Sequence, residues 1–183
     1  MTFEFVSGDN VIIDLANETF GVGNYTSSIK NTEAVYGSNQ NDQLAGDDID
    51  NILSGGLGDD TLYGAAGADH LYGGSGSDLF IYTSASDTGL GDGSRDKIFD
   101  FDAGTSTSSV DKLDLTGLID SDFSFVGLGD FVSGGTTSQV RVAPNSGSSL
   151  IQIDIDADAV ADTEIELVGN DGVNIDPTDF NAV

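Results

Sequence analysis

The amino-acid sequence predicts an all-β protein built on a parallel β-roll, a flattened solenoid of short strands joined by tight turns. Two observations predict this fold. A nine-residue repeat occurs five times in succession between Gly37 and Ile81, and this segment contains eight Asp but no Lys or Arg. Such repeats stack because one unit alone cannot bury its apolar side chains. We divide the chain into N-terminal capping strands at 1–35, the roll at 36–82, and a sandwich-like C-terminal β region at 83–183.

The third repeat, from Gly55 to Tyr63, shows the pattern that all five units follow. Its first, second and fourth residues are glycines, and its sixth is an aspartate. An acidic side chain or its amide recurs at the sixth position, at Asp42, Asn51, Asp60, Asp69 and Asp78. A large apolar residue follows two positions later, at Leu44, Leu53, Leu62, Leu71 and Phe80. A flexible linker rich in Gly and Asp would not keep this offset through five units.

Each unit supplies one short strand and one turn. In Thr61-Leu62-Tyr63, for example, alternation along the strand directs the apolar side chain inward. The other six residues form a turn, in which glycine takes positive φ without steric cost. Two units make one coil, so repeats n and n+2 stack on the same side. The repeats therefore predict two interior ladders, one of Leu44, Leu62 and Phe80, the other of Leu53 and Leu71.

Stacking also brings aspartates of successive coils together, beside the backbone carbonyls of the turns. Calcium takes roughly 6–8 oxygen ligands of this kind. We predict about three or more Ca²⁺ sites, at the pairs Asp42/Asp60, Asn51/Asp69 and Asp60/Asp78, with the neutral Asn51 giving the weakest. The predicted metal residues are Asp42, Asn51, Gly55, Gly56, Gly58, Asp60, Gly64, Gly67, Asp69, Gly73, Gly74, Gly76 and Asp78. Without cations this acidic segment repels itself, so metal binding is expected to drive its folding.

The pattern Gly-Gly-x-Gly-x-Asp-x-U-x, with U a large apolar residue, resembles the calcium-binding nonapeptide of RTX (repeats-in-toxin) proteins. Two later segments, Asp96-Lys97-Ile98-Phe99-Asp100-Phe101 and Asp111-Lys112-Leu113-Asp114-Leu115, are similar to a signature of serralysin-type secreted proteins. A polar insertion at 105–110 departs from that signature. The resemblance implies a calcium-stabilised β-roll, and it makes Asp96 a further metal candidate.

Strands are also predicted on both sides of the repeats. Before them, Val11–Leu15 and the segment from Tyr25 to Val35 are expected to cover the first coil, because an open coil exposes backbone and apolar surface. After them, strands are predicted at 123–126, 139–142, 150–155 and 163–168. The last two alternate apolar and polar residues, which is typical of a hairpin with one buried face.

An acidic loop follows Ile153. Its carboxylates, at Asp154, Asp156, Asp158 and Asp162, are spaced as at the start of an EF-hand. An EF-hand is rejected, because Ala159 stands where that loop needs glycine and Ile165 where it needs a bidentate Glu. The segment is more similar to the DxDGDGxAD hairpin of serralysin-like domains, with Ala157 and Ala159 in place of glycines. It is either an additional calcium site or an acidic hairpin exposed to solvent.

The chain ends Asp176-Pro177-Thr178-Asp179-Phe180-Asn181-Ala182-Val183, similar to the terminal element of RTX proteins that type I secretion systems export. Its first residues lack a basic region, so a Sec-type signal is not expected. The resemblance implies a secreted, extracellular bacterial module that folds on calcium outside the cell. The module would assist export of a larger protein through a type I exporter.

Composition and missing motifs exclude several function classes. With a net charge of −27, the chain cannot cluster the Lys and Arg that nucleic-acid phosphates require. No apolar run approaches the roughly 18 residues of a membrane span. Cys is absent, and so are the HExxH, GxSxG and phosphate-loop motifs. The single histidine, His70, is expected to face outward, so we expect a module that is not itself an enzyme.

Two further functions stay open. Related modules of mannuronan epimerases bind alginate along a roll, so a carbohydrate- or surface-binding module is the main alternative. Alginate is a polyanion, whereas this chain has five basic residues and none in the repeats. A neutral glycan or a cell-surface partner therefore ranks above alginate. The terminal region of a large adhesin is the third possibility.

Overall fold

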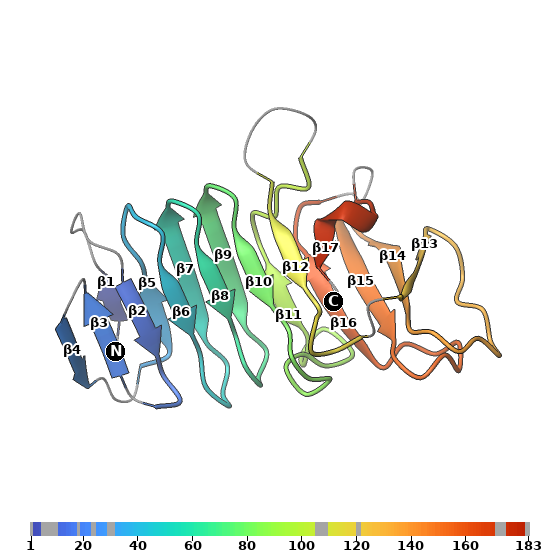
Figure 1. Ribbon diagram of the computed structural model, residues 1–183, viewed down its shortest axis with the longest axis horizontal. Helices are drawn as coiled ribbons and strands as arrows, with labels where there is room; N and C mark the ends of the chain where they lie inside the picture. The colour runs from blue at the N-terminus through green and yellow to red at the C-terminus, as the bar shows by residue number, and fades with distance from the viewer. Residues whose placement is uncertain are drawn as a thin grey trace.

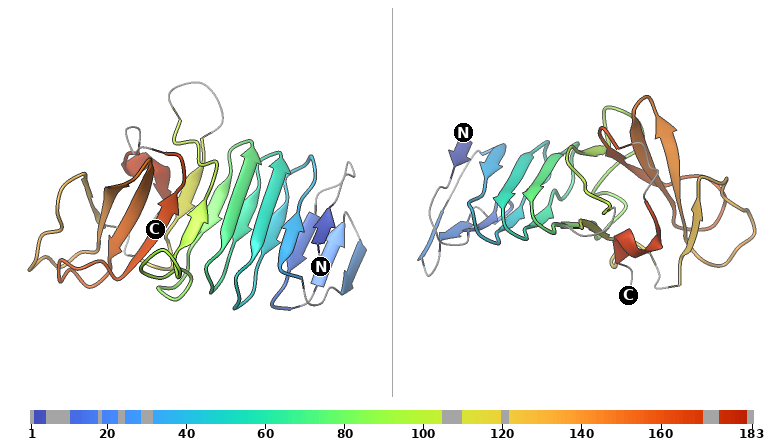
Figure 2. Two further views of the ribbon diagram at one scale, coloured as in Figure 1. Left: turned by 180° about the vertical axis from the view of Figure 1, so that it is seen from behind. Right: turned by 90° about the horizontal axis from the view of Figure 1, so that it is seen from above.

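The computed structural model of the protein describes residues 2–4, 11–17, 19–22, 25–28, 32–104, 110–119, 122–170 and 175–181. It is an elongated β-roll whose strands are stacked along the long axis (Figure 1). Seen from above, the strands form two layers that enclose a narrow interior (Figure 2). The predicted fold class, a parallel β-roll with flanking strands, is confirmed.

Two sheets make up these layers. The first, in spatial order, contains β1 (Thr2–Glu4), β5 (Ala34–Tyr36), β7 (Ile52–Leu57), β9 (His70–Ser75), β11 (Asp96–Ile98), β16 (Thr163–Leu167), β15 (Ser148–Asp154), β14 (Gln139–Asn145) and β13 (Ser124–Gly127). The second contains β17 (Phe180–Asn181), β12 (Lys112–Asp114), β10 (Leu79–Ile81), β8 (Thr61–Tyr63), β6 (Gln43–Ala45), β2 (Val11–Asp14), β3 (Thr19–Val22) and β4 (Tyr25–Ser28). From β5 to β12, successive strands alternate between the sheets, so two strands make one coil.

The strand register follows the period of the repeats. Gln43 of β6 is paired with Thr61 of β8, and Ile52 of β7 with His70 of β9. Both pairs are parallel and join residues two nonapeptides apart. The predicted stacking of repeat n on repeat n+2 is therefore confirmed.

The interior consists of two ladders of apolar side chains, each at most 6% exposed. The first contains Ile13, Leu44, Leu62, Phe80, Leu113 and Phe180. The second contains Val35, Leu53, Leu71, Ile98 and Leu167. Both include the predicted repeat positions and extend beyond them at each end. Full burial of one such side chain contributes roughly 1.5–3 kcal/mol, so the ladders are the main apolar stabilisation of a thin core.

At the N-terminal end, β2, β3 and β4 form an antiparallel meander, and β2 pairs in parallel with β6 of the roll. The segment predicted from Tyr25 to Val35 contains β4 at its start and the first residues of β5 at its end. Residues 29–31 lie outside the described part. On the other sheet, β1 pairs with β5 and precedes the first coil.

At the C-terminal end, the sheets continue past residue 82. Strand β11 pairs in parallel with β9, and β12 with β10, so both serralysin-like segments add a strand to the roll. Strands β14, β15 and β16 form an antiparallel meander joined to β11 through β16. Arg95 holds this junction through ion pairs with Glu164 and with Glu166, the latter at 3.1 Å. Residues 105–109 of the predicted insertion and the final residues 182–183 lie outside the described part.

A short 3₁₀ turn, η1 (Pro177–Asp179), precedes β17. Asp176 caps it, since its carboxylate accepts a hydrogen bond from the Thr178 amide at 2.7 Å and its own amide donates to the Asp179 carboxylate at 2.8 Å. In the described residues, no helix is long and apolar enough to cross a membrane.

Candidate metal centre

The predicted glycines line the turns of the roll in two structural roles. Five of them have positive φ, namely Gly56, Gly58, Gly67, Gly74 and Gly76. At Gly56, where φ is 115°, an added Cβ would also overlap the Ser38 carbonyl oxygen of the preceding coil. The other three, Gly55, Gly64 and Gly73, lie against an aspartate of their own repeat. Glycine is therefore required both by backbone conformation and by close packing.

The sixth-position side chains are hydrogen-bonded from coil to coil. On one side, the Asp42 amide donates to Asp60 Oδ1 at 2.7 Å and the Asp60 amide to Asp78 Oδ1 at 2.8 Å. On the other side, the Asn51 amide donates to Asp69 Oδ1 at 2.8 Å. These are the three pairs that the repeats predict. Each bond fixes one carboxylate oxygen and leaves the other to a further partner.

That second oxygen is buried and has no protein partner. Within the described residues, no hydrogen bond reaches Oδ2 of Asp60, Asp69 or Asp78, and these residues are at most 1% exposed. Oδ2 of Asp96 is buried as well, with the buried Tyr82 hydroxyl as its neighbour. In the three repeat positions, Oδ2 is directed at the first glycine of the same repeat, so closely that a Cβ there would overlap it. A buried carboxylate oxygen without a partner is costly. A cation in the turn would satisfy it.

The pKa values of these carboxyl groups show that burial also disfavours their ionised form. Burial, together with neighbouring carboxylates, raises the pKa of Asp60 and Asp69 to about 7 and that of Asp96 to about 8. Burial likewise raises the pKa of Asp78 and brings that of Asp111 to about 7. No Lys or Arg occurs between residues 37 and 81 to offset these charges. Near neutral pH the ladders therefore require either protons or a metal cation.

The donor set fits calcium. Only oxygen donors line the turns, namely carboxylates and backbone carbonyls, with neither sulfur nor imidazole among the sixth-position side chains. Hard cations prefer such ligands, and Ca²⁺ accepts the irregular geometry of a loop more readily than Mg²⁺ does. The residues that would hold calcium are the ladder aspartates, together with the carbonyls of the glycine turns.

Both ladders begin with a side chain that differs from the rest. Asp42 is fully hydrogen-bonded, because Oδ1 accepts from the Val11 amide at 2.6 Å and Oδ2 from the Ser38 amide at 2.5 Å. The amide group of Asn51 is engaged with Asp47, accepting from its backbone amide at 2.9 Å and donating to its carboxylate at 3.3 Å. The first side chain of each ladder thus has fewer oxygen atoms available to coordinate a cation than the side chains that follow.

Both ladders also continue beyond the repeats. The Asp69 amide donates to Asp96 Oδ1, and the Asp78 amide to Asp111 Oδ1, each at 2.9 Å. Asp96 was a secondary candidate from the sequence, and Asp111 was missed. The signal was present, because Asp96-Lys97-Ile98 and Asp111-Lys112-Leu113 repeat the spacing of aspartate and apolar residue. The nine-residue period is lost there, so a search by period does not reach them.

Asp100 closes the last turn. Its carboxylate accepts hydrogen bonds from the amides of Gly73 at 2.9 Å and Gly74 at 3.0 Å. At the first position of earlier repeats, the amides of Gly37 and Gly46 donate instead to the backbone carbonyls of Ser54 and Tyr63 in the next coil. A side chain therefore takes the place of that backbone where the repeats stop.

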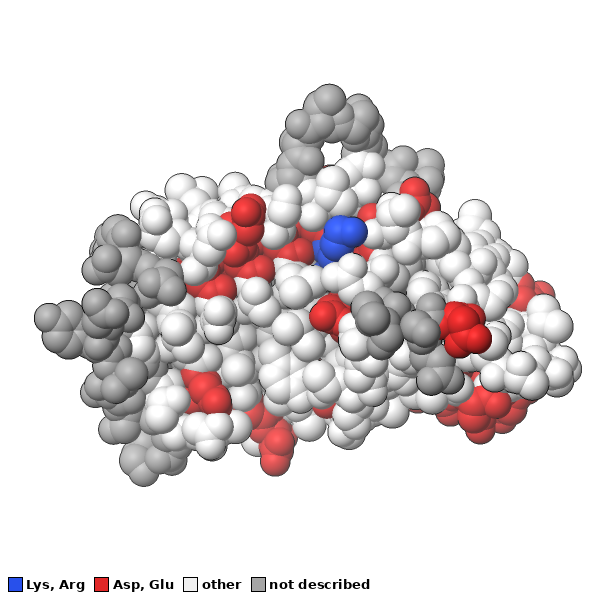
Figure 3. All heavy atoms as spheres, viewed as in Figure 1, with Lys and Arg blue, Asp and Glu red and all other residues white. Residues whose placement is uncertain are grey.

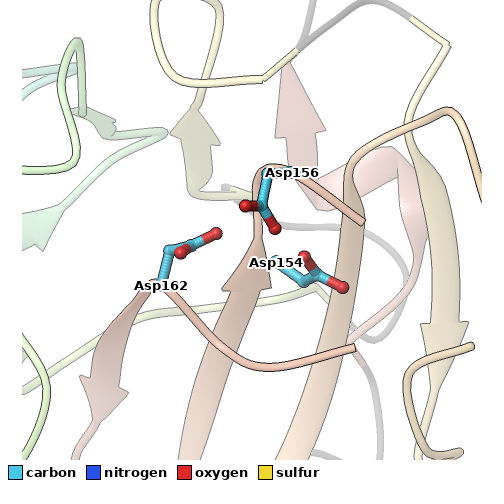
Figure 4. Close-up of side chains that lie close together, drawn as sticks. All are labelled: Asp154, Asp156 and Asp162. Atoms are coloured by element: carbon cyan, nitrogen blue, oxygen red, sulfur yellow. The ribbon is translucent and has the colours of Figure 1, made fainter. Parts of the chain in front are cut away.

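The acidic hairpin between β15 and β16 brings three carboxylates together. Ligand oxygens of Asp154, Asp156 and Asp162 lie within 4.8 Å of one another (Figure 4). Asp154 is buried and accepts from the Ala159 amide at 2.9 Å, while the other two are exposed. Asp158 lies outside this group and accepts a hydrogen bond from the Val160 amide. Ala157 and Ala159 have φ of 61° and 74°, so the glycine-type conformation expected of the hairpin is retained without glycine.

Charge on the face shown in Figure 3 is mainly negative, and much of it lies toward the edges of the roll where the turns are. The strands between these edges present mostly uncharged side chains. His70 lies on β9 with its ring 5.1 Å from that of Phe99 in an edge-to-face contact. It is half-buried on the outer surface of its sheet, as alternation with the buried Leu71 requires.

Comparison with known proteins agrees with this geometry. Residues 45–80 match the family described as RTX calcium-binding nonapeptide repeat (4 copies). The chain thus contains a segment of calcium-binding RTX repeats within its β-roll, and such repeats are typical of secreted proteins. No curated protein matches the chain.

The solved structures similar to this chain include two subunits of a mannuronan C5-epimerase from Azotobacter vinelandii. The AlgE6R3 subunit is 25% identical, with 78% of each chain covered and a TM-score of 0.46. The AlgE6R2 subunit is 25% identical, with 82% of this chain and 91% of that chain covered and a TM-score of 0.36.

Proposed function

We propose that this protein is a module whose roll folds when calcium binds between its coils. The observation that carries the proposal is the row of buried carboxylate oxygens that have no hydrogen-bond partner among the described residues, at Asp60, Asp69 and Asp78. Because the unfolded chain has no such arrangement, the free energy of metal binding adds to the free energy of folding.

The proposed sites lie between aspartates of adjacent coils. Three pairs combine two charged carboxylates with an oxygen that lacks a partner, namely Asp60/Asp78, Asp78/Asp111 and Asp69/Asp96. The pairs Asp42/Asp60 and Asn51/Asp69 are proposed as weaker sites, since their first members are already hydrogen-bonded. The acidic hairpin is a further candidate, with Asp154, Asp156 and Asp162 as ligands.

Far-ultraviolet circular dichroism of the chain tests the coupling. In EDTA we expect a largely unfolded spectrum, and in millimolar calcium a β spectrum. Magnesium should restore less structure, because it keeps its water and demands compact octahedral geometry. A spectrum that is the same in EDTA and in calcium would refute calcium-driven folding.

We further propose that the module folds outside the cell and assists type I export of a larger protein. Extracellular calcium modules have dissociation constants of roughly 10⁻⁴–10⁻³ M, which suits a chain unfolded in a calcium-poor cytosol and folded outside. The terminal Asp179 and Phe180, with their similarity to exported RTX tails, support this role. So does the absence of Cys, since no disulfide is needed for a fold that metal can stabilise.

We propose that the chain is not itself catalytic and that its second role is to bind a neutral glycan. The observation that favours a glycan is a row of aromatic side chains on the outer face of the nine-stranded sheet. Tyr36 is 38% exposed there, and Tyr72 and Phe99 are half-buried beside it.

A further inference from the structure

The outer face of the nine-stranded sheet carries one row of aligned side chains. Tyr36 of β5 is paired with Ser54 of β7, and Ser54 with Tyr72 of β9. Phe99 follows, since its amide donates to the Leu71 carbonyl of β9 at 3.0 Å. The residue that precedes each of these four is buried, with at most 1% of its surface exposed. Because side chains alternate between the two faces of a strand, the row itself is directed to solvent. The strands that carry it lie next to one another in Figure 1.

Two members of the row show how rings are arranged on this face. Tyr72 and Phe99 stack with ring centroids 4.7 Å apart and planes 10° from parallel. That separation equals the distance between neighbouring strands, about 4.8 Å. The rings therefore stand side by side along the row, and His70 supports Phe99 from the side at 5.1 Å.

Ser54 interrupts this stack. Tyr36 and Tyr72 are two strands apart, which places them roughly 9.5 Å from each other. The serine side chain is too short to fill the space between the two rings. A ring inserted above Ser54 would lie about 4.8 Å from each tyrosine, the same spacing as in the Tyr72–Phe99 pair. We call this space the Ser54 slot, bounded by Tyr36, Ser54 and Tyr72.

The slot combines apolar walls with hydroxyl groups. Within the described part of the chain, the hydroxyls of Tyr36, Ser54 and Tyr72 are not engaged by other side chains. A pyranose has apolar C–H faces that suit aromatic rings and a rim of hydroxyls that can bond to these three groups. Its puckered ring is thicker than a flat aromatic ring, which suits a spacing of about 4.8 Å on either side.

Charge near the slot favours a neutral sugar. Lys97, on the neighbouring strand β11, is paired with Asp92 at 2.7 Å and lies 3.9 Å from Glu166. With a net charge of −27, the chain as a whole repels polyanions. Beside the slot, a hollow of about 270 Å³ whose lining includes Ala34, Ile52 and His70 gives room for an adjoining sugar unit.

From this geometry we infer that the Ser54 slot binds one pyranose ring of a neutral glycan, sandwiched between Tyr36 and Tyr72. The inference rests on the proposed glycan-binding role and on a roll folded by calcium. It assigns the ligand class and the residues that would hold it.

Isothermal titration of the calcium-loaded chain with neutral gluco-, manno-, galacto- and xylo-oligosaccharides tests the inference. We expect at least one of them to bind, with affinity reduced tenfold or more in Ser54→Phe, which fills the slot, and in Tyr72→Ala, which removes a wall. Tyr63→Ala is the matched control, because Tyr63 lies on β8 of the opposite sheet. It should bind like the wild type.

Circular dichroism of the same samples separates the two proposals. If calcium induces β-structure but no neutral oligosaccharide binds, the slot is refuted while calcium-driven folding stands. Binding that Ser54→Phe leaves unchanged, or binding of alginate oligosaccharides alone, also overturns it. Self-association of the wild type that Ser54→Phe abolishes, with no sugar bound, would assign the slot to a protein ring instead.

Discussion

The backbone amide of Asp69 donates a hydrogen bond to Oδ1 of Asp96 across 27 residues of sequence. This bond joins the last complete coil of repeats to a segment that does not follow the nine-residue period. Oδ2 of Asp96 is buried, with the buried Tyr82 hydroxyl as its neighbour. The carboxylate ladder thus includes side chains outside the repeats, and several expected outcomes depend on that extension.

Asp96→Asn should weaken calcium-induced folding as much as a substitution within the repeats. The amide keeps the oxygen that accepts from Asp69 but removes the charge that a cation requires. We expect the calcium midpoint, followed by circular dichroism, to rise about tenfold, equivalent to about 1.4 kcal/mol. Asp122→Asn removes the same charge at an exposed position and should leave the midpoint unchanged. Equal midpoints for the two variants would contradict a site at Asp96.

Asp60→Ala and Asp78→Ala should be similarly damaging, and both more so than Asp42→Ala. The repeats alone make Asp78 an end position, but the structure bonds it to coils on both sides, through Asp60 and Asp111. Asp42 is already satisfied by backbone amides. Calorimetric titration with calcium should show the larger loss of affinity at the two shared positions. A ranking with Asp42 as the most damaging position would contradict the proposed pairing.

Asn51→Asp should have opposite effects with and without calcium. The new carboxylate adds a charged ligand opposite Asp69, so the calcium midpoint should fall several-fold. In EDTA the same change replaces a hydrogen bond to Asp47 with repulsion, so residual structure should decrease. Asn39→Asp adds the same charge at an exposed position and should change neither quantity much. A higher calcium midpoint in Asn51→Asp would show that the neutral amide is preferred.

Acid should partly replace calcium. Burial raises the pKa of Asp60 and Asp69 to about 7 and that of Asp96 to about 8, against an ordinary value of 3.8. A carboxyl group with a raised pKa in the folded state stabilises the fold when protonated. That stabilisation is complete below pH 3.8 and is lost as the pH rises through 7 to 8.

In EDTA, β-structure measured by circular dichroism should therefore increase as the pH falls from about 8 to about 5. In calcium the dependence is reversed, because protons compete with the metal and the calcium midpoint should rise over the same range. A metal-free chain that loses structure on acidification in this range would contradict the raised pKa values.

Removal of residues 179–183 should retain the chain inside cells that carry its type I exporter. The same truncation should loosen the C-terminal end of the roll, because Phe180 covers Leu113 and lies 5.5 Å from the ring of Phe125. Phe125→Ala is the matched control, since it loosens this cluster but keeps the tail. Exporters pass unfolded chains, so the control should reach the medium. Secretion of the truncated chain at the wild-type level would leave the tail as a capping strand only.

The period of nine residues was sufficient to predict the roll, its two ladders and the pairing of repeats, because each depends on local spacing. Leu44 stacks on Leu62 since both occupy the same place in units of equal length. Asp111 could not be found in this way, since 33 residues separate it from Asp78. Nor does spacing show that Val11 satisfies Asp42 or that Asp47 engages Asn51, since both contacts depend on how the coils are closed.

Because strands alternate between the two sheets, only an even number of repeats can be added or removed without changing the sheet in which β11 lies. Each nonapeptide moves the chain from one sheet to the other, and β16 can pair in parallel with β11 only because β11 lies in the nine-stranded sheet. Eighteen residues inserted within the repeats would lengthen the protein by one coil, about 4.8 Å, and leave both ends intact. Nine residues would bring β11 to the wrong layer. Evolution of such a chain should therefore gain and lose repeats in twos.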